Sequence, residues 1–376
     1  MKLFVLQENL NRGLSVVGRL VAGKTQLPIL NNVLLATDKG RLRLSATNLE
    51  MGINFWVGAK IEEEGAITVP ARMLGEFIAS LPGEKVELAL SDGVLKAVSG
   101  GVEATFNGIA AGEFPAVPVL VGEPTLLLAS SIFSQAVSCT AFAAATDEGR
   151  QVLTGVKWIF RGEEFIMAAT DGYRLSVKKF KTKRKGEDGE LLIPARALQE
   201  MVKILGEEKP KKPKAEEGEE VRIRVTPEAN QAIFEIGDTG LVTRLLEGQF
   251  PNFEKIIPKE SATKTTIDTA DFLRAVRVAA IFARDSANLV KLKIEKSLLR
   301  ISSNTPQVGA NMSTIEAKTE GEECEIAFNC RYLLDFLSGV AGGRLLLEVN
   351  GPLHPGVLKL VGDDSFLHVI MPVRVQ

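Results

Sequence analysis

One segment of this chain has the residue types and the spacing of a phosphate-binding loop. Residues 18–25, GRLVAGKT, place two glycines, a lysine and a threonine at the positions of the G-x-x-x-x-G-K-[ST] pattern. Such a loop works when a buried strand leads into it and a helix leaves it, because that order aims backbone N–H groups at the phosphate. Here Leu10, Leu14 and Val17 recur at helical spacing before the loop, and Pro28 favours extended backbone after it. The order helix, loop, strand therefore predicts a solvated basic loop instead of a nucleotide site.

A second segment with possible chemistry is the triplet Asp238-Thr239-Gly240, which is the triplet of aspartic proteases. Those enzymes need two aspartates that share one proton. The chain contains one such triplet, so a protease site would require a dimer that brings two of them together. Because the triplet lies between the strand-like segments AIFEI and LVTRLL, we interpret it as a turn.

Histidine and cysteine are too scarce for the common metal sites and catalytic triads. His354 and His368 are the only histidines, and we expect ordinary turn or strand positions for both. Cys139, Cys324 and Cys330 form neither an even disulfide framework nor paired CxxC motifs, which favours a reducing compartment. We expect no metal site and no cofactor.

The sequence also lacks the signals of membrane insertion. No segment approaches the roughly 20 apolar residues that span a bilayer. The first residues, MKLFVLQENL, have too short an apolar run for a signal sequence. We therefore expect a cytoplasmic protein without a membrane partner.

The elements that would carry any site belong to a threefold repeat. Three related motifs, VPAR, IPAR and FNCR, begin at Val69, Ile193 and Phe328. Apolar residues follow the arginine of each motif at one, two, five, six and nine positions, which predicts one apolar stripe on a helix. An acid four positions after each arginine can support that helix; the three pairs are Arg72 with Glu76, Arg196 with Glu200, and Arg331 with Asp335.

Two further pairs of motifs set the domain count. ATNLE at residues 46–50 matches ATDGY at 169–173, and GEFP at 112–115 matches GQFP at 248–251. We predict three domains, over residues 1–122, 123–258 and 259–376. The middle copy contains an extra run of Glu, Lys and Pro at residues 206–220, which has too few apolar side chains to offset the entropy of ordering. We expect a mobile, solvated insertion there, with a nucleic-acid-binding segment as the alternative.

Each repeat is expected to contain two helices and several short strands. The predicted helices cover residues 7–21, 71–81, 131–144, 195–206, 271–284 and 330–340. Alternating segments such as KLFVLQ, RLRLSAT, KVELAL, VRIRV, AIFEI, LRISS and LLLEV predict strands between them. The fold class is therefore α+β, with antiparallel sheets covered on one face by helices.

The predicted helices are more basic than the rest of the chain. They contain five acidic residues and nine basic ones, which are Arg12, Arg19, Arg72, Arg196, Lys203, Arg274, Arg277, Arg284 and Arg331. The helices therefore carry a net charge of +4 in a chain whose net charge is −2. Solvated helix faces explain this distribution equally well. If the helices gathered around one space, however, that space would attract duplex DNA without reading its bases.

Taken in order, eight segments resemble the bacterial β sliding clamp family, the β subunits of DNA polymerase III: LPILNNVLL, ATNLE, VPAR, GEFP, ATDGYRLSV, IPAR, GQFPNFEKIIP and HVIMPVRVQ. The resemblance covers the whole chain. It implies a head-to-tail homodimer in which six similar domains form a ring, with sheets outside and two helices of each domain lining a central hole. Head-to-tail contacts of this kind close into a ring when their rotation allows it.

The same resemblance implies a non-catalytic processivity factor. The ring would encircle duplex DNA without sequence specificity and tether the replicative polymerase α subunit, other polymerases and repair proteins that carry a clamp-binding peptide. Tethering raises the effective concentration of the polymerase at the template. A clamp loader would open the ring with ATP, so the ATP chemistry would belong to that partner.

The family's partner site is an apolar cleft between domains two and three that accepts a peptide with a Gln, a Leu and a terminal Leu-Phe pair. Mapped onto this chain, the cleft is formed by Leu153, Thr170, Gly172, Tyr173, Arg174, Leu175, Pro251, Lys255, Ile256, Val369, Met371, Pro372, Val373 and Arg374. The residues implied to face DNA are Lys24, Arg72, Arg150, Arg196 and Lys203. At the dimer interface, Phe106 would face Ile281 and Phe282. A three-domain scaffold that binds peptides but not DNA would have the same cleft, so it stays an alternative.

Overall fold

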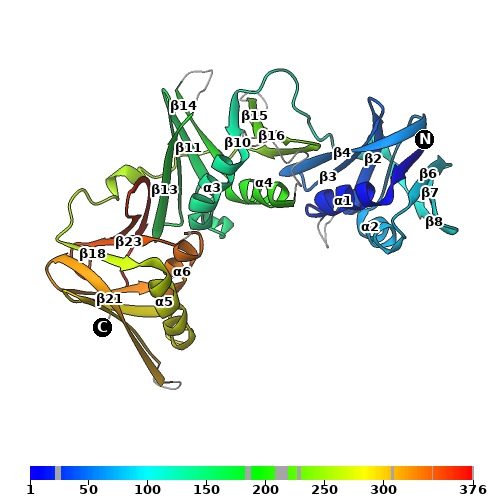
Figure 1. The fold of residues 1–376 in the computed structure, drawn as a ribbon. Helices are drawn as coiled ribbons and strands as arrows, with labels where there is room; N and C mark the ends of the chain where they lie inside the picture. The colour runs from blue at the N-terminus through cyan, green and yellow to red at the C-terminus, as the bar shows by residue number, and fades with distance from the viewer. Residues whose placement is uncertain are drawn as a thin grey trace. The chain divides into compact units, whose positions relative to one another are not determined.

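The computed structural model describes residues 1–21, 27–182, 188–207, 219–226, 230–305, 309–340 and 342–374. The chain divides into two compact units, and the middle repeat is shared between them. Unit 1 comprises Met1–Ser131 and Glu200–Leu245, and unit 2 comprises Ile132–Gln199 and Leu246–Gln376. Each unit is built on one sheet whose described strand pairs are antiparallel (Figure 1). The three predicted domain boundaries stay predictions, because compactness follows these sheets and not the repeats.

In unit 1, thirteen strands of the described residues form the sheet. They are β1 (Lys2–Leu6), β2 (Asn32–Asp38), β3 (Arg41–Thr47), β4 (Met51–Glu63), β5 (Ala66–Pro70), β6 (Lys85–Ser91), β7 (Val94–Ser99), β8 (Val102–Asn107), β9 (Ile109–Ala110), β10 (Leu126–Ala129), β15 (Glu220–Thr226), β16 (Gln231–Ile236) and β17 (Thr239–Arg244). The main path is β10-β15-β16-β17-β4-β1-β6-β7-β8, and β17 pairs directly with β4. Strands of the middle repeat therefore continue the sheet of the first.

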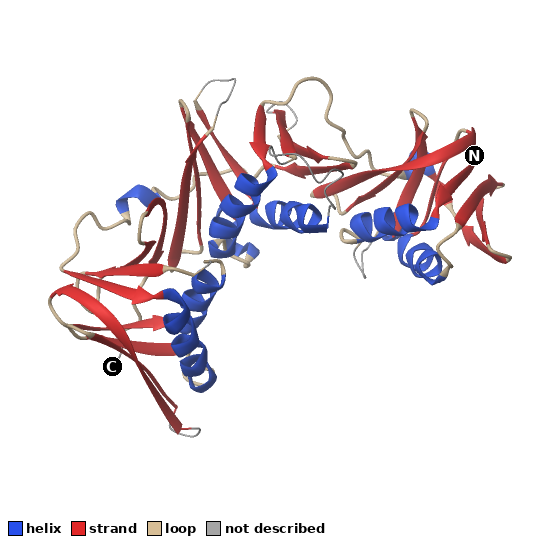
Figure 2. Cartoon of the chain, in the orientation of Figure 1, coloured by secondary structure: helices blue, strands red, loops and turns tan. Residues whose placement is uncertain are grey.

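The helices of unit 1 cover one face of these strands (Figure 2). Helix α1 (Gln7–Gly18) packs against β3, β4 and helix α2 (Ala71–Ser80) through its buried residues Leu10, Leu14 and Val17. Gly13 lets this helix approach closely, because a Cβ atom there would lie 2.7 Å from Cδ1 of Leu44. Helix α4 (Ala195–Glu207) has its last residues, from 200 onward, in unit 1 and its first five in unit 2.

Unit 2 contains a sheet of twelve described strands. They are β11 (Gly155–Arg161), β12 (Glu164–Thr170), β13 (Arg174–Lys181), β14 (Gly189–Pro194), β18 (Thr263–Asp268), β19 (Leu289–Ile294), β20 (Leu298–Thr305), β21 (Gly309–Gly321), β22 (Cys324–Asn329), β23 (Arg344–Val349), β24 (Gly356–Leu360) and β25 (Asp363–Ile370). The order is β14-β11-β12-β13-β25-β24-β23-β18-β21-β20-β19-β22. The pairing of β13 with β25 joins the middle repeat to the third in the way that β4 and β17 join the first to the middle.

Helices α5 (Thr269–Ala283) and α6 (Cys330–Ser338) complete unit 2, together with α3 (Ser130–Thr140) from its third residue onward. Helix α5 packs against α6 and against β19, β20 and β21. Phe272, Leu333 and Phe336 from these two helices share one buried cluster with Phe328 of β22. No helix in the described part of the chain is long and apolar enough to cross a membrane.

The predicted elements are confirmed, with local differences. All six helices form, but α3 ends at Thr140 and a 3-10 turn, η3 (Ala141–Ala143), replaces its expected end. The prediction that Met73 belongs to the buried apolar stripe is wrong, since Met73 is 63% exposed on α2 while Leu74 and Ile78 are buried. The predicted insertion at 206–220 lies mostly outside the described residues, which resume at 219.

The acids that follow the three repeat motifs differ in their partners. Glu76 receives a 2.8 Å hydrogen bond from Nε of Arg72, as expected for a helical pair. Glu200 instead contacts Lys203 and Arg19, and Asp335 pairs with Arg174 of β13. The second and third acids thus each connect two repeats, which local spacing alone does not predict.

Candidate partner-binding site

The turn between β12 and β13 is held by its own side chains. The hydroxyl of Thr170 donates to the carbonyl of Arg174 (2.6 Å) and accepts from the backbone N–H of Gly172 (3.0 Å). The carboxylate of Asp171 accepts from the N–H groups of Tyr173 and Arg174, at 2.9 and 3.0 Å. Gly172 has a φ of +93°, a left-handed conformation that glycine adopts without steric cost. This turn fixes Tyr173 directly before β13, and the residue is 59% exposed.

The end of the chain runs beside this turn. Leu175 pairs with Val369 in the ladder of β13 and β25, and the N–H of Met371 then donates to the carbonyl of Tyr173 (2.8 Å). Further along, the N–H of Val373 donates to the carbonyl of Ala327 (2.8 Å). Two backbone hydrogen bonds therefore hold the tail that was expected to form one wall of the cleft.

A buried apolar cluster lies beneath these segments. Leu175 and Val369 belong to it, together with Phe250, which precedes Pro251, and Phe253 of the 3-10 turn η6 (Phe253–Lys255). Leu153 and Thr170 are buried as well, and Val152 packs against the cluster. The structure thus brings the three predicted segments, around 153–175, 251–256 and 369–374, to one core of unit 2.

Apolar side chains also remain at the surface of the three segments. Tyr173 is 59% exposed, Met371 40% and Ile256 37%. Pro251, Lys255 and Arg374 are exposed, whereas Pro372 and Val373 are half-buried. A flexible thioether beside an aromatic ring, above a buried core, can accept apolar peptide side chains of different shapes.

Arg174 is mostly buried and supports the turn that carries Tyr173. Its side chain is 10% exposed, and its Nε donates to Asp171 at 3.0 Å. Its Nη2 donates to the carbonyl of Phe142 (2.7 Å), and the guanidinium lies 4.6 Å from the centre of the Tyr332 ring. Burial, and after it the charge of Asp171, raises the pKa of Tyr332. The contacts with Phe142 and Tyr332 were not predicted from the sequence because both residues lie far from Arg174 in the chain.

The two enzyme-like motifs have structural explanations. The carboxylate of Asp238 lies 3.2 Å from Nη1 of Arg41, in the turn between β16 and β17. Gly18 is the last residue of α1, and the next described elements after it are the 3-10 turn η1 (Pro28–Asn31) and β2. The predicted order of helix before strand is therefore confirmed on both sides of residues 22–26, which lie outside the described residues together with Lys24.

The histidines and cysteines occupy structural positions too. His368 is completely buried in β25, where its Nδ1 lies 2.6 Å from the hydroxyl oxygen of Ser176. His354 lies in an exposed turn before β24. All three cysteines are free, and burial raises the pKa of the Cys139 thiol.

Comparison with known proteins identifies the family. Models of the N-terminal, central and C-terminal domains of the DNA polymerase III beta subunit match residues 1–118, 127–252 and 254–374. The chain is 32% identical over 383 residues to the beta sliding clamp of Synechococcus elongatus, with both sequences covered completely. It is 28% identical to that of Staphylococcus aureus, with 94% of each sequence covered. The chain belongs to the bacterial β sliding clamp family.

Solved sliding clamps share the whole fold. The DNA polymerase sliding clamp from Bacillus subtilis matches with a TM-score of 0.92 and 28% identity, and both chains are covered completely. A sliding clamp from Pseudomonas aeruginosa bound to griselimycin matches with a TM-score of 0.90 and 25% identity over the full length of both chains. The sliding-clamp fold extends over three domains, and clamps of this fold are ring-shaped dimers. The predicted fold class and the predicted role as a non-catalytic processivity subunit are confirmed.

Among the residues expected to face DNA, Arg72, Arg196 and Lys203 are exposed on helices α2 and α4. Arg72 and Lys203 each contact a carboxylate of their own helix, on Glu76 and Glu200. Arg196 forms no ion pair with a residue that the structure describes. Arg150 lies in the 3-10 segment η4 (Glu148–Thr154), and its Nη2 donates to the carbonyl of Asp171 at 3.4 Å. Arg150 therefore also contacts the turn that carries Tyr173.

The residues expected at the dimer interface differ in exposure. Ile281 is 59% exposed near the end of α5, and its neighbour Phe282 is half-buried. Phe106 is 6% exposed and packs edge-on against Phe77 of α2, with ring centres 5.6 Å apart. It lies in β8, which is an edge strand of the unit 1 sheet as described. An edge strand offers unpaired backbone groups to a second chain.

Proposed function

We propose that two copies of this chain close head to tail around duplex DNA in the cytoplasm and hold partner proteins through the cleft at the β13–β25 junction. The partners would be the replicative polymerase α subunit, other polymerases and repair proteins that carry a short clamp-binding peptide. A clamp loader would open the ring. The observation that carries the site assignment is the hydrogen bond from Met371 to Tyr173, which sets two exposed apolar side chains side by side over a buried core.

The chemistry of this junction suits a peptide better than a small polar substrate. Tyr173 and Met371 expose apolar surface next to backbone groups, and Lys255 and Arg374 add positive charge on the neighbouring segments. Leucine and phenylalanine side chains would insert between the apolar residues, and a glutamine would bond to the polar rim. Arg174 and Asp171 would keep the turn in one conformation, so less entropy is lost on binding.

A topological experiment tests encirclement and separates it from the scaffold alternative. The protein is loaded on nicked circular plasmid, washed in high salt, and the plasmid is then linearised. We expect retention on the circle and release from the linear form, because a closed ring leaves only over a free end. Equal retention on both forms would contradict encirclement and favour the peptide-binding scaffold.

A deletion tests the cleft. Removal of Met371–Gln376 is expected to abolish binding of a peptide that ends in Leu-Phe, while the chain stays dimeric in sedimentation. The substitution Met371→Ala is expected to weaken the same peptide without removing the backbone bond to Tyr173. The matched control is Val361→Ala, which shortens another exposed apolar side chain of unit 2. Unchanged affinity after the deletion would refute the site assignment.

A further inference from the structure

The junction between the first and middle repeats has the same backbone framework as the junction that carries the proposed cleft. The hydroxyl of Thr47 donates to the carbonyl of Met51 (2.8 Å) and accepts from the N–H of Leu49 (3.0 Å). The side-chain oxygen of Asn48 accepts from the N–H groups of Glu50 and Met51, at 3.1 and 2.8 Å. These four bonds match those of the turn 170–174 atom for atom, with Asn48 in place of Asp171.

The neighbouring strand continues the match. The N–H of Arg244, at the end of β17, donates to the carbonyl of Glu50 (3.0 Å). Met371, just beyond β25, makes the equivalent bond to Tyr173. Arg244 of the first junction is therefore equivalent in position to Met371 of the second, and Glu50 is equivalent to Tyr173. The two junctions share a scaffold but present different side chains.

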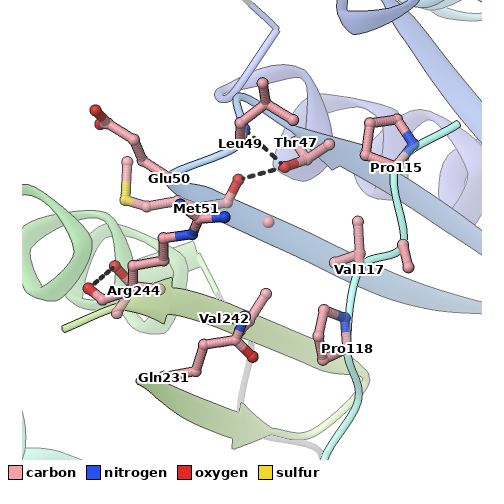
Figure 3. Close-up of a pocket in the computed structure, with 13 residues that line it drawn as sticks. Thr47, Leu49, Glu50, Met51, Pro115, Val117, Pro118, Gln231, Val242 and Arg244 are labelled. Atoms are coloured by element: carbon pink, nitrogen blue, oxygen red, sulfur yellow. Dashed lines mark hydrogen bonds between the residues drawn. The ribbon is translucent and has the colours of Figure 1, made fainter. Parts of the chain in front are cut away.

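The first junction contains a hollow of about 150 Å³ inside unit 1. Figure 3 shows Pro115, Val117 and Pro118 of the connecting segment along one side, with Met51 and Arg244 on the other. A cavity of this volume can hold a benzene-sized group, so it has room for one apolar side chain.

Glycine at position 52 shapes this hollow. The position matches Leu175 of the second junction, and a Cβ atom on Gly52 would lie 2.6 Å from Cγ1 of Val117. The absence of a side chain lets the connecting segment lie against the strands.

The rim of the hollow contains a strained and exposed leucine. Leu49 has a φ of +76°, at the position where the second junction has Gly172, and it is 46% exposed. A branched side chain in the left-handed region is uncommon and costs conformational energy. Such residues concentrate at ligand clamps and binding sites. Because the side chain of Leu49 is exposed, its packing contributes little that could offset the strain of the backbone.

The rim also offers a positive charge. Arg244 is exposed and lines the hollow, and its guanidinium forms no ion pair with any residue that the structure describes. A guanidinium in this state binds a carboxylate through paired, charge-assisted hydrogen bonds. An apolar side chain next to a carboxylate therefore complements the hollow in shape and in charge.

We propose that this first junction is a second docking site, which takes a short peptide of a partner protein with one leucine-sized side chain beside an acidic residue or a C-terminal carboxylate. The apolar side chain fills the hollow between Val117 and Met51, and the carboxylate pairs with Arg244. Its assignment to a protein ligand rests on the proposed function, because the same framework carries the proposed cleft. Each chain then has two peptide sites with different preferences.

Methyl-detected NMR of the full-length dimer tests the site. The probe is acetyl-Gly-Leu-Asp-Gly-amide, and its control has Asn in place of Asp. We expect saturable shifts of the Leu49, Met51 and Val117 methyl signals with the acidic probe, and at least about tenfold weaker binding of the control, as expected for a charge-assisted bond. The variant Arg244→Gln is expected to remove this difference between the two probes.

A second variant keeps the test independent of folding defects. In Leu49→Gly the new glycine accepts the positive φ, as Gly172 does. This variant is expected to weaken binding of the acidic probe several-fold. Met371→Ala serves as the crossed control, because it is expected to weaken only the peptide that ends in Leu-Phe. The proposal would be overturned if the methyl signals of the first junction did not shift, or if Met371→Ala abolished binding of the acidic probe. Failure of the Leu-Phe peptide alone would count against the proposed cleft and leave this second site standing.

Discussion

Arg174 and Asp335 form an ion pair that joins two repeats across unit 2. Arg174 begins β13, and Asp335 lies on α6, 161 residues further along the chain. The same guanidinium donates to Asp171 (3.0 Å) and to the carbonyl of Phe142 (2.7 Å). One side chain therefore connects two elements: the turn that carries Tyr173 and helix α6 of the next repeat.

Replacement of this arginine is expected to destabilise unit 2. Arg174→Met keeps much of the side-chain volume but leaves the Asp171 carboxylate, which is 14% exposed, without its partner. We expect the free energy of unfolding to fall by about 3 kcal/mol, as for a broken buried ion pair. Fluorescence of the buried Trp158 in a Trp56→Phe background reports unit 2 alone during urea unfolding.

Asp335→Asn is the matched comparison, because Asp335 is 46% exposed and Arg174 keeps its bonds to Asp171 and Phe142. Its expected cost is below about 1 kcal/mol, which is typical of exposed ion pairs. If both variants shifted the unfolding midpoint equally, the network would not depend on the buried part of the arginine.

His368 is expected to make unit 2 sensitive to acid. Burial, with the charge of Arg174 as a smaller cause, lowers the pKa of its imidazole to about 3, against an ordinary value of 6.5. Between these values the unfolded chain binds a proton that the folded chain excludes. The free energy of unfolding therefore falls as the pH falls through this window, by up to about 1.4 kcal/mol per pH unit.

His368→Gln removes the titrating group and is expected to flatten the pH dependence of the unfolding midpoint between pH 6.5 and the range where carboxylates titrate. His354→Gln, in an exposed turn, is expected to leave the slope unchanged. The measurement again uses Trp158 fluorescence. An equal slope in the wild type and in His368→Gln would mean that other groups cause the acid sensitivity.

The elements were predictable from sequence because each has a local signal. Helix α4 follows IPAR with buried Ala197, Leu198 and Met201 at the predicted spacing, and β15 matches VRIRV. The order of helix before strand around residues 22–26 also followed from local patterns. The cleft residues came from family resemblance and not from spacing, and the structure brings them to one core without testing their role.

Long-range partners were not predictable in this way. No pattern in the sequence links Arg174 to Phe142 or Asp335, since each contact depends on how β13 meets another element. Met73 matches an apolar stripe, yet α2 turns it to the surface. The hollow at the first junction also depends on how the segment at Val117 lies over Gly52. Such contacts follow from tertiary packing, which periodicity does not encode.

Removal of Arg196 is expected to weaken attraction to DNA more than removal of Lys203. Both are exposed on α4, but Lys203 donates to Glu200 at 2.7 Å, which partly neutralises its charge. For Arg196→Ala we expect the slope of log affinity against log salt to become shallower by about 0.9 for each phosphate that the protein no longer neutralises. Binding of a short fluorescent duplex at several salt concentrations measures this slope.

The control for this experiment is Lys318→Ala, which removes a lysine that is 82% exposed on β21. It changes the net charge of the chain by the same amount as Lys203→Ala. An equal reduction of affinity in the Lys203 and Lys318 variants would indicate that net charge, and not the helix face, attracts DNA.

Ile281 offers the cleaner test of the dimer interface. It is 59% exposed near the end of α5, so Ile281→Asp is expected to leave the fold of the chain intact. In a dimer the new carboxylate would be buried against apolar groups, at a cost of about 2–3 kcal/mol. For each of the two interfaces of a head-to-tail ring, that cost corresponds to roughly a 30- to 150-fold increase in the dissociation constant of the dimer, which sedimentation over a range of concentrations measures.

A substitution of Phe106 would change the stability of unit 1 as well as any dimer contact. Its ring packs against Phe77 and is 6% exposed, so Phe106→Ala also removes core packing, at about 3 kcal/mol or more. Fluorescence of Trp56 in a Trp158→Phe background would detect that destabilisation in unit 1. Val361→Asp places the same charge on another exposed apolar position of unit 2 and is expected to leave the dimer unchanged. If Ile281→Asp dimerised as tightly as Val361→Asp, the interface would have to lie elsewhere than the end of α5.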